Sequence, residues 1–590
     1  MVTLFGIFDV GARALLAQQL GLNVTGNNIA NANTEGYSRQ RVNFVTSDPL
    51  NVTPGAIPTG VRVDSIERVR DQFLDFQVRA ATTEQGFLDK NSDILGELQV
   101  MLQDPLNPLA ELLEENPAES GLNALLSRFF GAFQELSANP ESIAVRATVR
   151  ETAITLARGL NALHSGLSGM AERLNQQVSS GIAQMNGIFQ RIASLNQEIV
   201  RVEANPQNNA NDLRDMRDNL LNQLAQYAPI TVTEQPNGQV DVRILGTGVV
   251  IGSRVAPLEA ITDPEDPTGK FEIINSIERS RILTEDLDTG ILGSLIQARD
   301  ELVPGLIGQI DTLAKTIIRE VNNIHTGAIG LESFSEITGT ISMDDPNGDL
   351  EDLDLDFPPA AGSFVIRVVN QNNVVQNLYT INFDPTVDSL NDLAAQIDAI
   401  DGAAGPGAGS ISAAVTAGNQ LQITANGGLK FTFQGDTSHV LTALGINTFF
   451  SGNDAESMQV SESIMNSESG LRRIAASATG ASGDNGASLQ LAALQNALVA
   501  DGNTTTVGDS YRRMIAELGV RAQRNTTELN ASDASLLDLK SRQESVSGVS
   551  LDEESINLIR FQQAFNAAAR YITTVDTLID RVVNGMGATR

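Results

Sequence analysis

The two ends of this 590-residue chain carry apolar side chains at the spacing of a coiled coil. Near the C-terminus a 3-4-3-4-3-4-3 spacing runs through Leu558, Phe561, Phe565, Ala568, Ile572, Val575, Ile579 and Val582. Near the N-terminus the same spacing, with polar and glycine breaks, runs through Phe5, Phe8, Ala12, Leu15, Gln19, Leu22, Gly26 and Ile29. A repeat of about 3.5 residues lays a narrow seam along a helix, and such a seam packs against another helix. We therefore expect the ends to pair with each other or with neighbouring copies, in a subunit of an assembly.

The chain has no cysteine, and its only histidines are His164, His325 and His439. Disulfides and thiolate metal sites are therefore absent. The histidines are far apart, and none stands in an HExxH or HxxxH pattern. These features disfavour a zinc enzyme and a Ser-His-Asp hydrolase, and we expect neither a metal nor another cofactor. A hydrolase that uses a pair of carboxylates remains as an alternative.

The formal net charge is −33, from 39 basic and 72 acidic residues. Residues 1–50 sum to zero and residues 549–590 to −1, so the excess lies in the middle of the chain. An acidic body repels phosphate backbones and anionic lipids, which disfavours binding to nucleic acid or to a membrane surface. The nearly neutral ends can pack side by side without strong repulsion.

No targeting segment is visible near the N-terminus, because Asp9 and Arg13 interrupt the apolar residues and no basic region precedes them. No apolar run approaches the ~18 residues of a membrane span. We expect no membrane insertion, and a cytosolic protein unless it leaves by a route without a cleaved signal.

Helical periodicity dominates both flanks of the chain. Residues 142–203 predict one helix, which at ~60 residues would be about 90 Å long. Further helices are predicted over 213–224, 290–325 and 511–546, and Asn525 in the last of these is a polar residue that can fix register. Gly548 then breaks the helix, and Ser550 with Glu553 predicts a capping box that restarts it.

The middle of the chain changes to a period of two. Ile230 to Ile244, around a Pro-Asn-Gly turn, predicts a hairpin, and residues 338–455 predict a second β-rich block with a short helix near 388–400. The expected fold is α+β, with long paired N- and C-terminal helices and β-rich outer domains inserted between them. The expected segments are 1–75 (axial helix and elbow), 76–229 (helical rod), 230–289 (β-rich hairpin domain), 290–337 (helical return), 338–455 (outer β-rich domain), 456–548 (C-terminal rod) and 549–590 (axial helix).

Two segments look like ligand loops. Gly405 to Gly409 follows no clear strand and opens no helix, which disfavours a phosphate cradle. Asp345, Asn347, Asp349 and Asp356 stand at positions 1, 3, 5 and 12 of a calcium loop. Leu350 occupies the position that needs glycine, so we expect a solvated acidic loop, with calcium binding as the alternative.

Residues 23–40, NVTGNNIANANTEGYSRQ, resemble the N-terminal signature of bacterial flagellar axial proteins, the family of rod, hook and hook-associated subunits. SGVSLDEE at 547–554 and FQQAFNAAAR at 561–570 resemble the C-terminal signature. The GYSRQ ending, LRDMRDNLLNQL at 213–224 and the helix at 290–328 are similar to the hook-associated members at the hook–filament junction. The terminal motifs are widespread in the family, whereas their combination with the internal helices is specific.

The resemblance implies a structural adaptor, several copies of which form a ring at the distal end of the hook and template the filament. Implied partners are other copies, the hook protein, a second junction protein (hook-associated protein 3) and an export chaperone on the C-terminal region. It also implies export without a cleaved signal peptide and an extracellular place in the flagellum. The alternatives are a filament flagellin, another axial subunit, or a hydrolase carried on a flagellar scaffold.

The turn after the first helix has two readings. Asn28, Asn31, Asn33 and Gly36 favour a helix stop, or an elbow that contacts neighbouring subunits. We expect the assembly interface to include Phe5, Phe8, Leu15, Leu22, Asn28, Ile29, Asn31, Gly36, Tyr37, Leu558, Phe561, Phe565, Ile572, Val575 and Ile579.

Overall fold

The structure, a computed structural model, describes residues 4–52, 55–103, 121–205, 208–262, 269–279, 281–400 and 409–585. It divides into two compact units. The terminal unit comprises Met1–Asp93, Arg173–Asp300 and Gln523–Arg590, and the central unit comprises Ile94–Glu172 and Glu301–Ala522. Long helices and several small sheets confirm the predicted α+β class. The finer division into seven segments stays a prediction.

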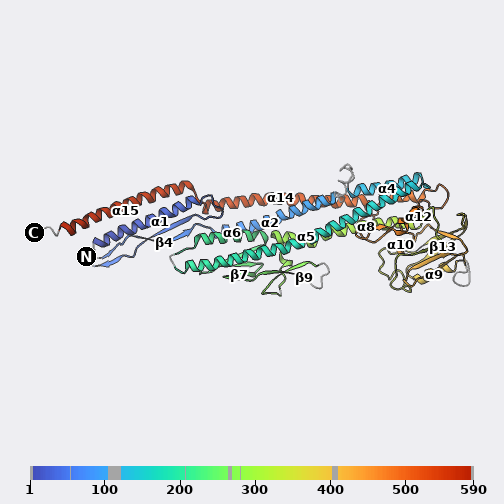
Figure 1. Cartoon of the computed structure of the whole chain (residues 1–590), viewed down its shortest axis with the longest axis horizontal. Coiled ribbons are helices and arrows are strands. Elements are labelled where there is room, and N and C mark those ends of the chain that lie inside the picture. The colour runs from blue at the N-terminus through green and yellow to red at the C-terminus, as the bar shows by residue number, and fades with distance from the viewer. Residues whose placement is uncertain are drawn as a thin grey trace. The chain divides into compact units, whose positions relative to one another are not determined.

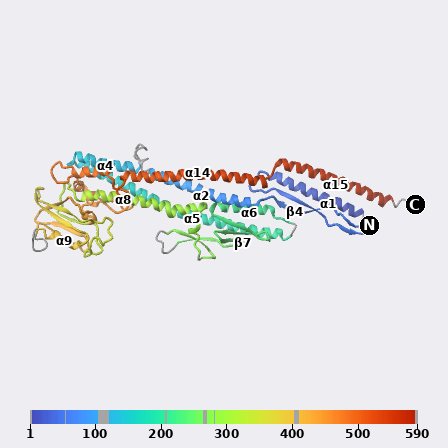
Figure 2. The same ribbon diagram turned by 180° about the vertical axis from the view of Figure 1, so that it is seen from behind.

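The two ends of the chain meet in the terminal unit. Helices α1 (Leu4–Ala30) and α15 (Leu551–Gly585) lie side by side, and the antiparallel strands β1 (Gln40–Thr46) and β4 (Val61–Arg68) run along α1 (Figures 1 and 2). A small hairpin of β2 (Leu50–Val52) and β3 (Gly55–Ile57) joins the two strands. The prediction that the termini pair with each other is confirmed.

The seam on α15 follows the predicted heptad as far as Ile579, whereas Val582, the last predicted position, is 40% exposed. Val575 is buried, and the other predicted positions from Leu558 to Ile579 are half-buried. On α1, two positions that contact α15, Gly11 and Gly21, each lie one position before a residue of the predicted seam. A Cβ on Gly11 would come within 2.8 Å of Ile572, and one on Gly21 within 3.1 Å of the Phe561 ring. Small residues at these positions therefore allow α15 to approach α1 closely.

Three other long helices contribute to the terminal unit. They are α2 (Gln72–Gln103), α5 (Ile143–Glu203) and α14 (Val507–Ser547), of which α5 and α14 confirm predicted helices. Asn525 of α14 is buried, donates to the Leu88 carbonyl (2.9 Å) and accepts from Asn91 (2.9 Å). Two adjacent long helices are thus held in one register by buried amides, as predicted for Asn525.

The remaining elements of the terminal unit surround the second half of α5. Helix α6 (Asn211–Tyr227) confirms the helix predicted at 213–224. The predicted hairpin is confirmed as β5 (Ile230–Glu234) and β6 (Val240–Ile244), and β7 (Thr247–Ile251) and β8 (Arg254–Val255) extend it. Strands β9 (Leu258–Thr262) and β10 (Phe271–Asn275) form a second pair. Asn196 of α5 donates to the Val240 carbonyl (2.8 Å), which fixes the sheet on the helix.

The helix predicted over 290–325 has a discontinuity. It consists of α7 (Gly290–Gln297), a π-helical turn at Ala298–Leu302 and α8 (Val303–Thr326). Pro304 lacks an N–H, which explains why regular α-helical bonding is interrupted just before it.

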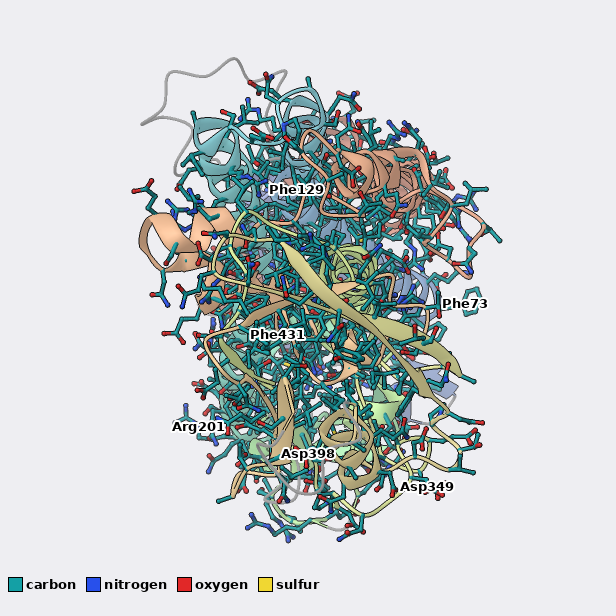
Figure 3. All side chains as sticks on the ribbon, turned by 90° about the vertical axis from the view of Figure 1, so that its right-hand side faces the viewer. Phe73, Phe129, Arg201, Asp349, Asp398 and Phe431 are labelled. Atoms are coloured by element: carbon teal, nitrogen blue, oxygen red, sulfur yellow. The ribbon has the colours of Figure 1, made fainter. Side chains whose placement is uncertain are left out.

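The central unit contains the β-rich block. Strands β13 (Val375–Phe383), β12 (Gly362–Val369) and β16 (Lys430–Gln434) form one sheet, and β11 (Glu336–Thr338), β15 (Leu421–Ala425) and β14 (Ile411–Val415) form another. The predicted short helix is α9 (Leu390–Asp398), and α10 (Val440–Ala443) follows β16. Their shared core includes Phe364, Phe431 and Phe433. Figure 3 shows Phe431 among the packed side chains, with Asp349 toward the rim.

The rest of the central unit is largely helical. Helix α4 (Leu122–Ala138) packs Phe129 against Phe449 and Phe450, with ring centroids 5.9 and 5.6 Å apart. Short elements complete the unit: β17 (Phe450–Ser451), β18 (Gln459–Val460), α11 (Glu462–Met465), α12 (Ser467–Arg473) and α13 (Gly486–Ala493).

His325 is fully buried at the end of α8. Its Nδ1 donates to the Asn447 carbonyl (2.8 Å), because its Nε2 accepts from the Ala475 N–H (3.0 Å). Burial lowers the pKa of His325 to about 4; the bond to Asn447 opposes this shift, and the nearby Arg146 adds to it. The native state therefore keeps this histidine neutral at neutral pH.

Acidification should destabilise the central unit through His325. The pKa is lower in the folded than in the unfolded chain, so the unfolded state binds more protons as pH falls from about 6.5 toward 4. Between pH 7 and pH 5 this group should cost about 2 kcal/mol of unfolding free energy. Denaturant unfolding of the full chain at both pH values checks this against His325→Gln, which should remove that part of the loss. An equal loss in the variant would contradict the assignment.

Candidate assembly site

The α1–α15 pair leaves several large apolar side chains exposed within the terminal unit. On α15 the exposed residues are Leu551, Ile556, Ile559, Tyr571, Leu578 and Val582, and on α1 they are Ile7, Phe8 and Leu16. Ile559 is 54% and Leu16 64% exposed, although each is only one position from a residue of a predicted seam. We call these nine residues the outer stripe. Large apolar side chains exposed in such number are typical of a surface that binds another protein.

The predicted interface residues divide between the inside and the outside of this pair. Phe561 and Ile572 lie against α1. Val575 is buried, and the other predicted apolar residues of both helices that are at least half-buried are Leu558, Phe565, Ile579, Leu15, Leu22 and Ile29. Phe8 belongs to the outer stripe, and the side chain of Phe5 lies outside the described residues. Phe561 also packs on Phe44 of β1, with ring centroids 5.9 Å apart.

The elbow after α1 is held by Asn28, a buried amide. Its Nδ2 donates to the Gln40 carbonyl (2.8 Å) and to Glu554 (3.1 Å), and its Oδ1 accepts from the Gln40 N–H (3.0 Å) and the Tyr37 hydroxyl (2.8 Å). One amide thus joins the end of α1, the start of β1 and the first turn of α15. Burial, and then Asp212, Asp215 and Glu554, raise the pKa of Tyr37 to about 12, so this donor keeps its proton.

Glu554 is the second centre of the elbow. Its side chain is 2% exposed and accepts from Arg39 Nε (2.9 Å) and Nη2 (2.9 Å), while the exposed Glu553 binds Arg39 Nη1 (2.7 Å). The hydroxyl of Ser550 accepts from the Glu553 N–H (3.4 Å), which confirms Ser550 as the N-cap. The Glu553 carboxylate binds Arg39, although the capping-box prediction directed it back to Ser550.

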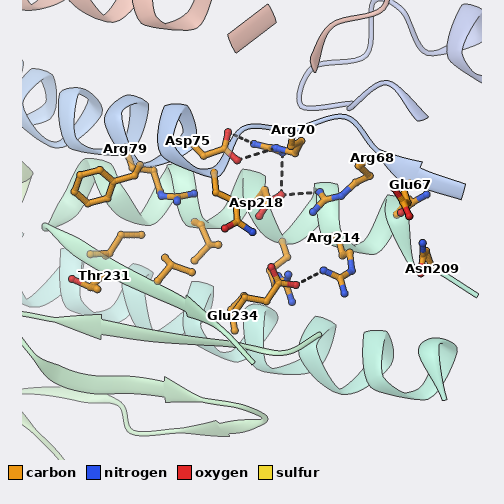
Figure 4. A pocket seen from close by; sticks show the side chains of 18 residues that line it. Glu67, Arg68, Arg70, Asp75, Arg79, Asn209, Arg214, Asp218, Thr231 and Glu234 are labelled. Atoms are coloured by element: carbon orange, nitrogen blue, oxygen red, sulfur yellow. Dashed lines mark hydrogen bonds and ion pairs between the residues drawn. The ribbon is translucent and has the colours of Figure 1, made fainter. Parts of the chain in front are cut away.

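A buried charge network connects the elbow to α6. The Ser38 N–H (3.0 Å) and hydroxyl (2.6 Å) donate to Asp215, which also receives Arg68 (2.7 Å). Asp218 receives Arg68 (2.8 Å) and Arg70 (3.0 Å), and Figure 4 shows Arg70 between Asp218 and Asp75. Burial tends to raise the pKa of Asp218, but Arg70 and Arg68 hold it below its usual value. The network therefore fixes α6 and α2 to the elbow.

The elbow residues are thus used within the chain. Asn28 and Tyr37 lie inside it, Asn31 donates to Asn27 (2.9 Å), and Gly36 turns the backbone at a φ of 78°. Contacts of these residues with neighbouring subunits stay a prediction. Sequence reasoning missed Arg68, Arg70 and Asp218, although the LRDMRDNLLNQL motif that contains Asp218 pointed to the region.

Gly36→Ala should destabilise the elbow by about 1–2 kcal/mol. Its φ lies in the left-handed region, and an added Cβ would come within 2.9 Å of Asn219 Nδ2. Gly26→Ala is the matched control, because Gly26 lies within α1 and a Cβ there meets nothing within 4 Å. It should stabilise α1 by about 0.5–1 kcal/mol. Hydrogen exchange of residues 4–30 measures the change in stability caused by each substitution. If Gly36→Ala left the exchange unchanged, the proposed role of Gly36 would be contradicted.

Of the two loops that resembled ligand sites, the structure describes the acidic one and only Gly409 of the other. Residues 405–408 lie outside the described part of the chain. In the acidic loop, Leu350 is buried and Asp356 faces Lys315 (3.5 Å) and Asn453 (2.8 Å). Across the described residues, no cluster of His, Asp or Glu has the arrangement needed to hold a metal ion. None of the helices in this part of the chain could span a membrane.

Comparison with known proteins finds matches to three flagellar family models. Residues 106–339 match the family described as the flagellar hook-associated protein FlgK helical domain. Residues 8–37 match the flagella basal body rod protein family, and residues 543–585 match the flagellar basal body rod FlgEFG protein C-terminal family. The two rod-protein matches coincide with the α1 elbow and with α15.

Full-length relatives carry one name. Flagellar hook-associated protein 1 of Bacillus subtilis is 29% identical over 616 aligned positions, covering 100% of this chain and 99% of the relative. The proteins of that name from Salmonella typhimurium and Escherichia coli are 28% and 24% identical, each covering 97% of this chain and 98% of the relative. Over nearly its whole length the chain is similar to proteins named flagellar hook-associated protein 1.

A solved structure shares the fold of this chain. The flagellar hook junction protein FlgK from Burkholderia pseudomallei aligns with a TM-score of 0.51 and 16% identity, over 80% of this chain and 100% of the other. At this identity the likeness concerns the fold alone.

Proposed function

We propose that this chain is a hook-associated protein 1 family member that acts as a structural adaptor at the hook–filament junction. Several copies form a ring on the distal hook through their α1–α15 pairs, and the ring templates filament growth. The observation that carries the proposal is the outer stripe, which stays exposed after the two terminal helices have paired.

The outer stripe has the chemistry of a subunit interface. Its nine residues come from both helices of the pair, and each large apolar side chain contributes about 1.5–3 kcal/mol when a neighbour covers it fully. Residues 549–590 carry a net charge of only −1, so copies can associate there without strong repulsion. The acidic charge lies elsewhere and supports solubility during assembly.

The hook protein on one side and a second junction protein, hook-associated protein 3, on the other are the proposed neighbours. The role is purely structural, without catalysis or a cofactor. The chain reaches this extracellular place by flagellar export without a cleaved signal peptide. An export chaperone covers the outer stripe of α15 beforehand, since an uncovered apolar surface favours premature association. A chain truncated before residue 540 should lose chaperone binding in a pull-down, and retention of binding would refute the docking site.

Immunogold electron microscopy of intact flagella tests the place of the protein. An antibody against the central unit should label a single band at the distal end of the hook. Label along the whole filament would instead identify a flagellin, and label along the hook or rod would identify another axial subunit.

A further inference from the structure

A cavity of about 220 Å³ in the central unit is lined by two arginines that form no ion pair with any described residue. Arg367 comes from β12 and Arg146 from the first turns of α5. The loop 477–484, rich in serine and glycine, forms much of the remaining wall. The cavity lies in the unit without the outer stripe, and it has no part in the proposed assembly function.

Arg367 is a buried cation with no acceptor. Phe364, Ile366 and Val368 point into the core of the β-rich block, so Arg367 projects from the opposite face of β12. It is 8% exposed, and among the described residues its guanidinium has no hydrogen bond and no ion pair. Burial lowers the pKa of Arg367. Thr432, its partner across the strands, is also buried, and its hydroxyl finds no partner in the described structure.

Arg146 increases the positive charge of the cavity. It is 1% exposed, and its Nη atoms donate to the carbonyls of Ile474 and Pro140, which are neutral. Its Nε has no acceptor among the described residues. Burial, and then repulsion by Arg472, lower the pKa of Arg146 to about 10. A buried guanidinium normally has a carboxylate or phosphate partner, since an unpaired buried charge is strongly unfavourable.

The nearby carboxylates are engaged by other groups. Asp484 accepts from Ser477 (2.7 Å) and from the Thr479 hydroxyl (2.6 Å) and N–H (2.7 Å), which orders the loop. Glu141 accepts from the Ser482 hydroxyl (2.8 Å). Glu332 lies beside Lys430 (3.1 Å) and Arg472 (3.4 Å). None of these three carboxylates neutralises Arg367.

The loop is shaped to approach Arg367. Gly480 has a φ of 78°, and a Cβ on it would lie 3.0 Å from Arg367 Cζ. Only glycine therefore lets the backbone pass so close to the guanidinium. Arginine presents a planar fork of donors that matches the oxygens of a carboxylate or a phosphate.

We propose that this cavity binds one small oxyanion, a phosphate or a carboxylate, between Arg367, Arg146 and the loop 477–484. The anion pairs with the free guanidinium of Arg367 and reduces the repulsion among the arginines. By contacting both β12 and the loop, it fastens the β-rich block to the helices of the central unit.

Calorimetric melting of the full chain tests the proposal at constant ionic strength, with chloride replaced by inorganic phosphate or by acetate. At a tenfold excess over Kd the anion should raise the Tm of the central unit by about 2 °C. If only phosphate raises the Tm, the ligand is a tetrahedral oxyanion. If acetate raises it as well, the site also accepts carboxylates, either free or on a protein side chain. No rise with either anion would overturn the proposal.

Arg367→Met separates a ligand site from a structural arginine. Arg367 makes no internal polar contact among the described residues, so the Tm of the variant's central unit in chloride should stay the same or rise. The further rise in Tm that phosphate causes should vanish. Arg512→Met, at an exposed arginine of the same unit, should keep the full rise. A Tm several degrees lower in chloride for Arg367→Met, or an undiminished phosphate effect, would contradict the site. Phosphorus NMR line broadening with the unaltered chain gives a second readout of binding.

Discussion

Phe561→Asp is expected to release α15 from α1 and to abolish filament formation. The Phe561 ring lies against Gly21 of α1 and Phe44 of β1, so aspartate would lose the apolar contact and place an unpaired charge at a helix–helix interface. The combined cost should be about 3–5 kcal/mol. Hydrogen exchange of residues 551–582 should accelerate strongly in the purified monomer, while the melting of the central unit stays unchanged. Cells should form hooks and secrete flagellin without building filaments.

Gln563→Asp is the matched control for this change. Gln563 lies two positions away on an exposed part of α15, so its substitution should change the unfolding free energy by no more than about 0.5 kcal/mol. Slow exchange in the Phe561→Asp monomer, or normal filaments on its cells, would show that the α1–α15 contact is not the basis of assembly.

The second large effect is expected at Glu554. Glu554→Ala removes the buried acceptor of both Asn28 and Arg39, and should destabilise the elbow by about 3 kcal/mol. The neighbouring carboxylate of Glu553, which is 61% exposed, binds the same arginine. Glu553→Ala should lower the stability of the elbow by less than about 1 kcal/mol. Hydrogen exchange at the start of α15 and the end of α1 measures the difference. Equal effects of the two substitutions would mean that the Glu554 contacts do not hold the elbow.

The sequence predicted α15 better than α1, for a physical reason. On α15 the residues that face the partner helix are large and apolar, so Phe561, Ile572 and Val575 produce a clear heptad. On α1 the close contacts lie at Gly11 and Gly21, which allow the close approach because they have no side chain. A hydrophobic pattern cannot show a surface made by small residues, and these two glycines each lie one position before a residue of the predicted seam.

The elbow shows the same limit for polar residues. Asn28, Gly36 and Tyr37 could be chosen from the sequence because they form a dense motif. The first helix does end nearby, at Ala30, but of the four residues predicted to stop it only Gly36 has a left-handed φ. Arg68 and Asp215, by contrast, are far apart in the chain, and only the fold brings them together at 2.7 Å. The sequence likewise could not predict that Arg367 is unpaired, because only the fold determines whether a carboxylate lies next to an arginine.

The absence of cysteine allows a direct test of the outer stripe with single-cysteine variants. Ile559→Cys should react fully with a maleimide in the purified monomer and become protected in assembled hook–filament junctions, since a neighbouring copy covers it. Gln376→Cys, on an exposed strand of the β-rich block, should react in both states. Full reactivity of Ile559→Cys in assembled junctions, with the protein demonstrably present there, would contradict the claim that the outer stripe joins the subunits.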